Sequence, residues 1–463
     1  MDRAAPDRSS GLSPSAASAA SAPTLLAAAR RRVVAHLARS LGLGHLALAE
    51  DAFQTAALRA LERWPRDGVP DDPAAWLYRV ARNAAIDALR VDGRHEPLPE
   101  AGEARELHAP PAAEGRFAGE LDDDELALLF AACHPSLPPA AQVVLALRTL
   151  GGHELSVLAP LLFTTEAALA QRLARARTQL AGQRLQVPAG RELPARRESV
   201  LTVLALMFHQ GQIASGRRGG IGNGPGDTGA VQDAMAPCWE AIRLARAVAA
   251  HPATAAPEAD ALAALLLLHG ARLTGRIDEH GDIVPLRGQP RDRWDAGMLR
   301  LGFAHLAASQ QGTRLTRWHL LAGIAGKHAL APDVDGTDWP AIVRYYDHLL
   351  ALDPSAAPRL GHAIALAEAG AADDARQRLL ALLPQVPTAL KAHTLAALAR
   401  ACSRMGDNAA AMSWLAQAVA AAPHPADARQ LTRQLARQLA KQTPQQAGQA
   451  GHRGPPNPTP RDG

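Results

Sequence analysis

The sequence has very few aromatic residues, few cysteines and no long apolar run. Aromatic residues make up 3% of the 463 positions although 48% are hydrophobic, so alanine and leucine must build the cores. Both are strong helix formers, and long β-branched runs are absent, which predicts an all-α protein. No apolar segment could span a bilayer, and the N-terminus lacks the basic-then-apolar order of a secretory signal. We therefore expect a cytoplasmic protein with no membrane contact.

The three cysteines, Cys133, Cys238 and Cys402, are far apart in the sequence. None of them has the paired spacing of a zinc ribbon, and small buried thiols are the simplest interpretation. No acid–base pair, nucleophile–histidine arrangement or phosphate loop is recognisable. The sequence therefore predicts a protein that is not an enzyme and that needs no metal or cofactor.

One short segment, GRIDEHGDIVPL, resembles a small β-hairpin around His280 and Gly281. It would hold the few strands of an otherwise helical chain. His280 lies among Asp278, Glu279 and Asp282, which could suggest a metal site. Because these residues follow one another through a turn, a solvated turn is the better interpretation.

Charge is distributed unevenly along the chain. Arginine exceeds acidic residues in residues 30–90 and again in 141–198, whereas acidic residues predominate between them, from 91 to 128. Two basic modules joined by an acidic connector suit two DNA contacts.

Residues 46–90 predict two helices joined by a turn. Neither Pro65 nor Gly68, both in the turn WPRDGVPDDP, suits a helix interior. Asp72 can cap the second helix, and Pro73 fits its first position. The second helix has an apolar face formed by Leu77, Val80, Ala81, Ala84 and Ala88.

A polar stripe runs along another face of this second helix. Arg79, Arg82 and Asn83 recur at helical spacing, with Trp76 and Tyr78 nearby. Guanidinium groups bind phosphate, an amide can read a base edge, and aromatic rings can stack on an unpaired base. The alternative is a solvated arginine face on an ordinary helix, which the spacing alone favours.

Residues 123–180 predict four further helices, of which the last two form a helix-turn-helix. Thr164 or Thr165 can cap the last helix, which presents Gln171, Arg172 and Arg175. An ordinary helical hairpin fits the spacing about equally well. Pro160 falls within the first helix of the motif, where proline removes a hydrogen bond and is expected to kink the chain.

A repeat is visible towards the C-terminus. Ala363, Gly370, Ala375 and Pro387 recur 36 residues later as Ala399, Gly406, Ala411 and Pro423. Small residues where helices cross and glycine at the turn are typical of a tetratricopeptide-like helix pair.

Several ordered phrases resemble a known family. AEDAFQTAALRALERWP and PAAWLYRVARNAAIDALR resemble the sigma-2 domain of extracytoplasmic-function (ECF) sigma factors of the sigma-70 family. ALLFAACHPSLPPAAQVVLALRTLGG and LAQRLARAR are similar to their sigma-4 domain, and RDGVP resembles the ECF subgroup with a C-terminal tetratricopeptide-like extension. The resemblance covers about residues 25–435. It implies a sigma-2 domain (23–92), an acidic linker (93–122), a sigma-4 domain (123–186) and a tetratricopeptide-like extension (196–440). The composition of the two ends predicts disordered tails at 1–22 and 441–463.

The resemblance also implies partners and site residues. Asp51 and Gln54 would face the clamp helices of the RNA polymerase β′ subunit. Trp76, Arg79, Arg82 and Asn83 would contact the −10 promoter element, and Gln171, Arg172 and Arg175 the −35 element. A small DGPF-motif (YCII-like) protein is a further expected partner. The alternatives are a DNA-binding regulator that does not recruit polymerase and a helical-repeat adaptor.

Overall fold

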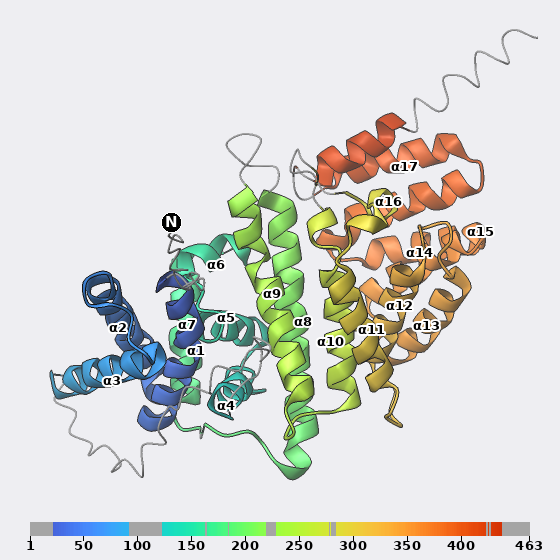
Figure 1. Ribbon diagram of the computed structural model, residues 1–463. Coiled ribbons are helices and arrows are strands. Elements are labelled where there is room, and N and C mark those ends of the chain that lie inside the picture. Colours follow the sequence, from blue (N-terminus) through green and yellow to red (C-terminus); the bar gives the residue numbers. More distant parts are fainter. Residues whose placement is uncertain are drawn as a thin grey trace, which may run out of the picture.

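A computed structural model of the chain describes residues 22–91, 123–162, 164–183, 185–218, 228–276, 278, 284–422, 425 and 427–437. These residues form helices and turns and include no strand, which confirms the predicted all-α fold. Successive groups of helices follow one another along an elongated molecule, from the α2–α3 pair at one end to α15 and α17 at the other (Figure 1).

The first module is a bundle of three helices: α1 (Ala22–Leu41), α2 (Leu46–Asp67) and α3 (Pro73–Val91). α1 packs on both other helices, and side chains such as Val33, Phe53 and Leu77 are buried between them. Ala88, predicted to be buried, is exposed, and Ala85 is buried instead. The last turn of α3 is exposed on most of its positions, so its apolar face ends one turn early.

The second module contains α4 (Asp123–Ala132), α5 (Pro139–Thr149), α6 (Leu155–Leu161) and α7 (Glu166–Leu180). α5 is buried along most of its length because α4, α7 and α8 all pack on it. Its strongly apolar sequence follows from this central position. Gly152, with φ of +71°, lies in the turn between α5 and α6, where a left-handed residue is needed.

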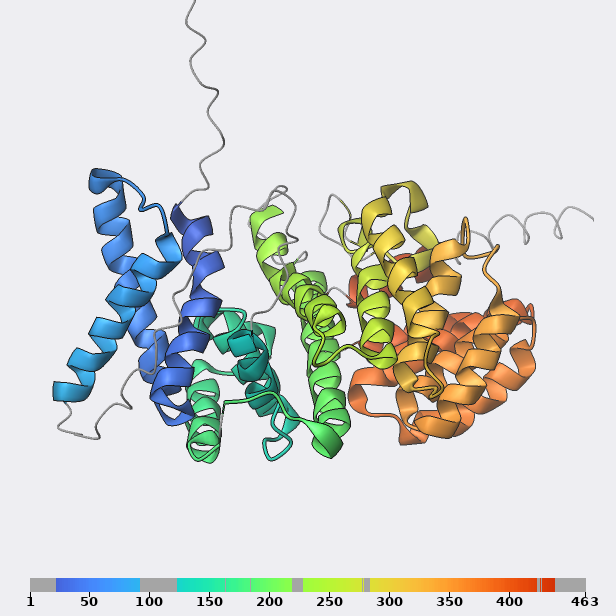
Figure 2. The same cartoon turned by 60° about the horizontal axis from the view of Figure 1, so that its bottom comes forward.

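The extension begins with α8 (Leu193–Arg218), α9 (Thr228–Ala250), α10 (Pro257–Gly270), α11 (Ala296–Ser309) and α12 (Arg317–Leu330). The long α8–α9 pair lies between the second module and the rest of the extension (Figure 2). α8 packs on α4, α5 and α6 as well as on α9. One hydrophobic core therefore runs without interruption from α1 to α12.

The remaining helices are α13 (Trp339–Leu352), α14 (Ala356–Glu368), α15 (Ala372–Leu382), α16 (Thr388–Arg404) and α17 (Asn408–Ala420). The sequence repeat corresponds to two helical hairpins, α14–α15 and α16–α17. The repeated glycines, Gly370 and Gly406, have φ of +99° and +81° in the two turns. The four repeated alanines are buried where the helices pack: Ala363, Ala375, Ala399 and Ala411.

Several expectations fall outside the described residues. The two tails, the acidic linker 93–122 and Pro423 belong to this group, as does most of the expected hairpin around His280. Near that hairpin, the N–H of Val284 donates to the carbonyl of Arg276 at 2.7 Å. No helix within the described ranges is long and apolar enough to cross a membrane. The three cysteines are buried, as expected.

Close packing of α8 on α9 depends on Gly211, and we expect Gly211→Ala to destabilise the protein. A Cβ atom at Gly211 would lie 2.6 Å from Sγ of Cys238 and 3.0 Å from its backbone nitrogen. Alanine favours a helix over glycine by about 1 kcal/mol, but overpacking typically costs about 1–3 kcal/mol. We therefore expect the thermal midpoint, followed by circular dichroism, to fall by roughly 2–4 °C.

Gly182→Ala provides the matched control, because a Cβ atom there would meet no atom within 4 Å. Equal midpoints for the two variants would contradict the close approach of α8 and α9.

Candidate nucleic-acid interface

Local signals end α2 and start α3. α2 continues through Pro65, contrary to the expectation from the sequence, and ends at Asp67, because Gly68 has a left-handed φ of +84°. The N–H of Gly68 still donates to the carbonyl of Trp64 at 3.1 Å. The Asp72 carboxylate accepts the N–H of Ala75 at 2.9 Å, which confirms the predicted N-cap. Trp64 and Trp76 pack edge to face with ring centroids 5.8 Å apart. This aromatic contact fixes the relative positions of the two helices beside the turn.

The polar stripe of α3 lies on the surface of the first module. Arg79, Arg82 and Asn83 are exposed, and in the described part of the chain they form no ion pair. Trp76 and Tyr78 are half-buried beside them. Burial raises the pKa of the Tyr78 hydroxyl, and the charge of Arg82 opposes this shift. The stripe thus offers two unengaged cations, an amide and an aromatic edge to a ligand.

Asp51 and Gln54, the predicted polymerase contacts, are both exposed on α2. The side-chain amide of Gln54 donates to the carboxylate of Glu154 at 3.2 Å. Glu154 belongs to the second module and precedes α6 directly. Gln54, but not Asp51, is therefore engaged by another part of the same chain.

Two helices separated by a short turn, α6 and α7, lie where the helix-turn-helix is predicted, with one difference at Pro160. The hydroxyl of Thr165 accepts the N–H of Ala168 at 3.2 Å and caps α7. α6 is seven residues long and continues one residue past Pro160, so the proline does not end the helix. The N–H of Thr164 donates to the carbonyl of Ala159 at 3.0 Å in the following turn.

α7 presents the predicted polar residues opposite a buried apolar face. Gln171 and Arg175 are exposed and Arg172 is half-buried, whereas Leu169 and Leu173 are buried. The predicted polar residues therefore lie on two separate surfaces, one on α3 of the first module and one on α7 of the second. The structure does not bring the two surfaces together.

The arginine cluster Arg30–Arg32, in the middle of α1, contacts the second module. Arg30 donates to the carbonyl of Thr149 at 2.7 Å, and Arg31 pairs with Glu125 at 3.2 Å. Burial lowers the pKa of Arg30, and the charge of Glu50 opposes this shift. Two further polar contacts join α1 to α4: His36 lies 3.0 Å from Asp124, and Arg39 pairs with Asp124 at 2.7 Å.

A buried carboxylate joins α2 to the second module. Glu50 has 3% of its surface exposed, and its carboxylate lies 2.6 Å from the guanidinium of Arg177 and 3.5 Å from that of Arg148. Arg148 also pairs with Glu154 at 2.8 Å. Removing one partner of such a buried pair leaves an uncompensated charge, so this network holds the two modules together.

Only a weak signal for the contact of Glu50 with the second module is present in the sequence. Glu50 follows Ala49 and precedes Phe53, so a carboxylate stands beside the apolar face of α2. The sequence also contains the basic run Arg30–Arg32, which could contact DNA phosphate or an acidic partner surface. In the structure, the acidic side chains that α1 contacts are on α4 of the same chain. Arg177 is also on the basic helix α7, but it pairs with Glu50 and is therefore not a candidate for contact with DNA.

Comparisons with known proteins assign two stretches of the chain. Residues 26–95 match sigma-70 region 2, and residues 196–310 match a family of unknown function (DUF6596). The probable RNA polymerase sigma factor RfaY of Xanthomonas campestris pv. campestris is 33% identical over 146 residues, which cover 30% of this chain and 35% of that protein. Residues 26–95 are therefore identified as a sigma-70 region 2 domain.

A longer stretch of the chain aligns with the uncharacterized protein R00370 of Rhizobium meliloti (strain 1021). The two are 36% identical over 331 residues, which cover 70% of this chain and 74% of the relative, so they belong to one family. An alignment of that length exceeds the two N-terminal modules, so the relative shares at least part of the extension. No solved structure matches the chain.

The known region 2 coincides with the first module, α1 to α3. It contains the α3 stripe and the Glu50 contact. Within the described residues, no group of histidine, cysteine, aspartate or glutamate side chains could hold a metal ion. The α3 and α7 surfaces present arginine and amide side chains, with aromatic rings beside them on α3, and these groups can bind a ligand.

Proposed function

We propose that this protein is an ECF-type RNA polymerase sigma factor of the sigma-70 family that is regulated by its C-terminal extension. The observation that carries the proposal is the presence of two exposed polar helix surfaces on two modules, one of which matches region 2. In this proposal the α3 surface contacts the −10 element, and Trp76 stacks on an unpaired base during melting. The α7 surface contacts the −35 element in the major groove.

Core RNA polymerase is the proposed protein partner. Asp51 and Gln54 would contact the clamp helices of the β′ subunit from the exposed face of α2. Gln54 can do so only after it releases Glu154, since its amide donates to that carboxylate. Polymerase binding and the contact between the modules would therefore compete at this residue. A small DGPF-motif protein stays a predicted further partner.

The distance between the promoter elements supports a change in arrangement. The −10 and −35 elements lie about 25 base pairs apart, which is about 85 Å of B-form DNA. α3 and α7 have 19 and 15 residues, so they are about 28 Å and 22 Å long. Both belong to modules that touch at the Glu50–Arg177 pair, so their surfaces are too close to reach both elements. We infer that the modules separate on promoter DNA.

The chain has the length that this separation needs. Residues 92–122 connect the modules, and 31 extended residues span about 100 Å. The extension is placed to control the separation because α8 packs on the second module. Arg196 at the start of α8 donates to the carbonyl of Phe130 at 2.8 Å. The second module thus lies between the first module and the extension (Figure 2).

We expect full-length protein to direct specific transcripts when it is added to bacterial core polymerase with a pool of genomic promoter fragments. Residues 1–189, which end before α8, should also direct transcripts, but at a different level, because the second module loses its contact with the extension. Run-off transcription at equal protein concentrations measures both. Equal output from the two forms would contradict regulation by the extension.

Core binding separates the proposal from its alternatives. A DNA-binding regulator or a helical-repeat adaptor would not bind core polymerase. Absence of binding in pull-down and fluorescence titration would therefore reject the sigma-factor proposal.

A further inference from the structure

A group of half-buried arginine and histidine side chains lies in the extension, where the end of α10 meets α12. It includes two short 3-10 turns that follow α10, η3 (Thr274–Arg276) and η5 (Arg291–Arg293). We call this group the cation cluster, and its members are His269, Arg272, Arg276, Arg291 and His328. All but His328 lie within the stretch that matches the family of unknown function.

The pKa shifts place these groups within reach of one another's charge. Burial, followed by the charges of Arg276 and Arg291, lowers the pKa of Arg272 to about 10. Burial, followed by Arg272 and Arg291, lowers the pKa of His328 to about 4. His269 is also shifted well below its usual pKa, mainly by burial, and its Nδ1 lies 3.2 Å from a guanidinium nitrogen of Arg272. Both histidines are therefore neutral near pH 7, and three arginines hold the positive charge.

These arginines have no ion-pair partner among the residues that the structure describes. Other half-buried arginines of the same stretch are paired: Arg243 lies 2.8 Å from Glu240, and Arg197 lies 2.6 Å from Glu258. For Arg291, the charge of Asp333 opposes the effect of burial, but the two groups form no ion pair. Burying several like charges without a counter-charge is strongly unfavourable.

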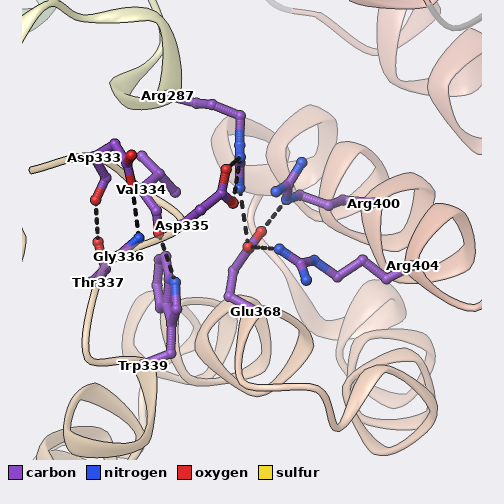
Figure 3. A network of polar contacts seen from close by, with 10 residues as sticks. All are labelled: Arg287, Asp333, Val334, Asp335, Gly336, Thr337, Trp339, Glu368, Arg400 and Arg404. Carbon is purple, nitrogen blue, oxygen red and sulfur yellow. Dashed lines mark hydrogen bonds and ion pairs between the residues drawn. The ribbon is translucent and has the colours of Figure 1, made fainter.

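A second arginine group in the extension shows what balances such charges. Arg287, Arg400 and Arg404 all contact the carboxylate of Glu368 (Figure 3). Arg287 also pairs with Asp335 at 2.7 Å. There, a nearly buried carboxylate of the chain lies at the centre of the arginines. Among the described residues, no carboxylate contacts the arginines of the cation cluster in the way that Glu368 contacts Arg287, Arg400 and Arg404.

Unpartnered donors point to the missing group. Four nitrogens that can only donate are buried without a hydrogen-bond partner: Nη1 of Arg276, both terminal nitrogens of Arg291 and Nε1 of Trp294. Nδ1 of His328 also lacks a partner, and its role as donor or acceptor depends on the tautomer. The Arg291 guanidinium lies 4.1 Å from the ring centroid of Trp294, and a Cβ atom at Gly275 would lie 4.0 Å from Nε1 of that ring. The donors of Arg291, Trp294 and the η3 turn are thus neighbours. Buried donors are almost always satisfied, and arginine and tryptophan nitrogens can only donate, so the missing group is an acceptor.

We propose that the cation cluster is a binding site for a small oxyanion, the phosphate or carboxylate group of a small molecule. Such a group supplies both the counter-charge and several acceptor oxygens in one place. Guanidinium groups bind phosphate and carboxylate through two parallel hydrogen bonds, which suits Arg291, because both of its terminal nitrogens lack a partner. The indole of Trp294 then donates a further hydrogen bond. The Trp339 ring at the start of α13 packs on His328, 5.2 Å between centroids, so the site also touches the C-terminal helices.

The test is thermal unfolding of the full chain in a buffer without phosphate, sulfate or carboxylate. Sodium phosphate and sodium succinate are added separately, with sodium chloride at matched ionic strength as the reference. At about a hundredfold excess over the dissociation constant, we expect the bound oxyanion to raise the midpoint by about 5 °C or more. The two arms distinguish a phosphate from a carboxylate ligand. Neither oxyanion exceeding chloride would overturn the proposal.

Two arginine variants separate ligand binding from structural pairing. Arg272→Met removes an unbalanced cation, so without added anion its midpoint should equal or exceed that of the unmodified protein, and the oxyanion-dependent rise should disappear. Arg243→Met is the matched control, because it leaves Glu240 unpaired. Its midpoint should fall while the oxyanion-dependent rise persists. If Arg272→Met is destabilised like Arg243→Met, or fails to fold, the arginine has a structural partner and the proposal is wrong.

Discussion

Replacing Arg82 and Asn83 together by alanine is expected to reduce specific transcription by about 100-fold or more while core-polymerase binding survives. Contacts of this kind are worth about 1–3 kcal/mol each, so losing two of them has a large effect on open-complex formation. Both side chains are exposed, so the fold should be unaffected. Run-off transcription measures the loss, and permanganate reactivity of unpaired thymines reports whether the −10 element still melts.

Arg378→Ala is the matched control for removal of a surface arginine. Arg378 is on α15, far from both N-terminal modules in the sequence, and pairs with Asp374 at 2.9 Å. Its transcription and thermal midpoint should stay close to those of the unmodified protein, since exposed pairs contribute little. Loss of core binding in the Arg82/Asn83 variant would show instead that the α3 surface faces polymerase rather than DNA.

Features set by local sequence could be predicted in detail. The Asp72 and Thr165 caps, the stop at Gly68 and the glycine turns of the repeat each depend on a few adjacent residues. The periodic apolar faces gave the helices themselves, because burial of one face needs only the 3.6-residue period. Even here the end of a face was misplaced. Ala88 continues the period, but nothing packs on the last turn of α3.

Contacts between distant segments could not be predicted. The sequence shows that Glu50 and Arg177 are charged, but not that they meet across 127 positions of chain. The same holds for the α1 arginines and α4, since either DNA or an acidic protein surface would satisfy them. Consequently the sequence placed the candidate site residues outside the core, as their exposure shows, but it did not reveal the contact that engages Gln54.

The boundary of the extension illustrates a second limit. The family resemblance predicts that the extension starts at residue 196, and α8 begins at Leu193. The hydrophobic core nevertheless continues across this boundary, because α8 packs on α4 to α6. The sequence indicates where a new segment starts, but the packing of α8 shows that this segment shares a core with the second module. The cation cluster likewise draws on residues 269 to 328, and no local pattern in the sequence marks it.

Locking the two N-terminal modules together with a disulfide is expected to abolish promoter-specific transcription. A Cβ atom at Gly44 would lie 3.4 Å from Cβ of Ala181, close to the range of about 3.5–4.5 Å found in disulfides. Gly44 is in η1 (Leu43–His45) of the first module, and Ala181 follows α7 directly. In the oxidised Gly44→Cys/Ala181→Cys variant the α3 and α7 surfaces cannot separate to reach both promoter elements. Reduction with dithiothreitol should restore transcription.

The reduced form of the same protein is the internal control for this lock, and each single variant controls for the substitutions. The native thiols should not interfere, because all three are buried, and burial raises the pKa of Cys133 and Cys238. Core binding of the oxidised form is informative as well. Weakened binding is expected if polymerase needs Gln54 released from Glu154. Full transcription by the oxidised form would show that the two modules act from the docked arrangement, and control by separation would then be wrong.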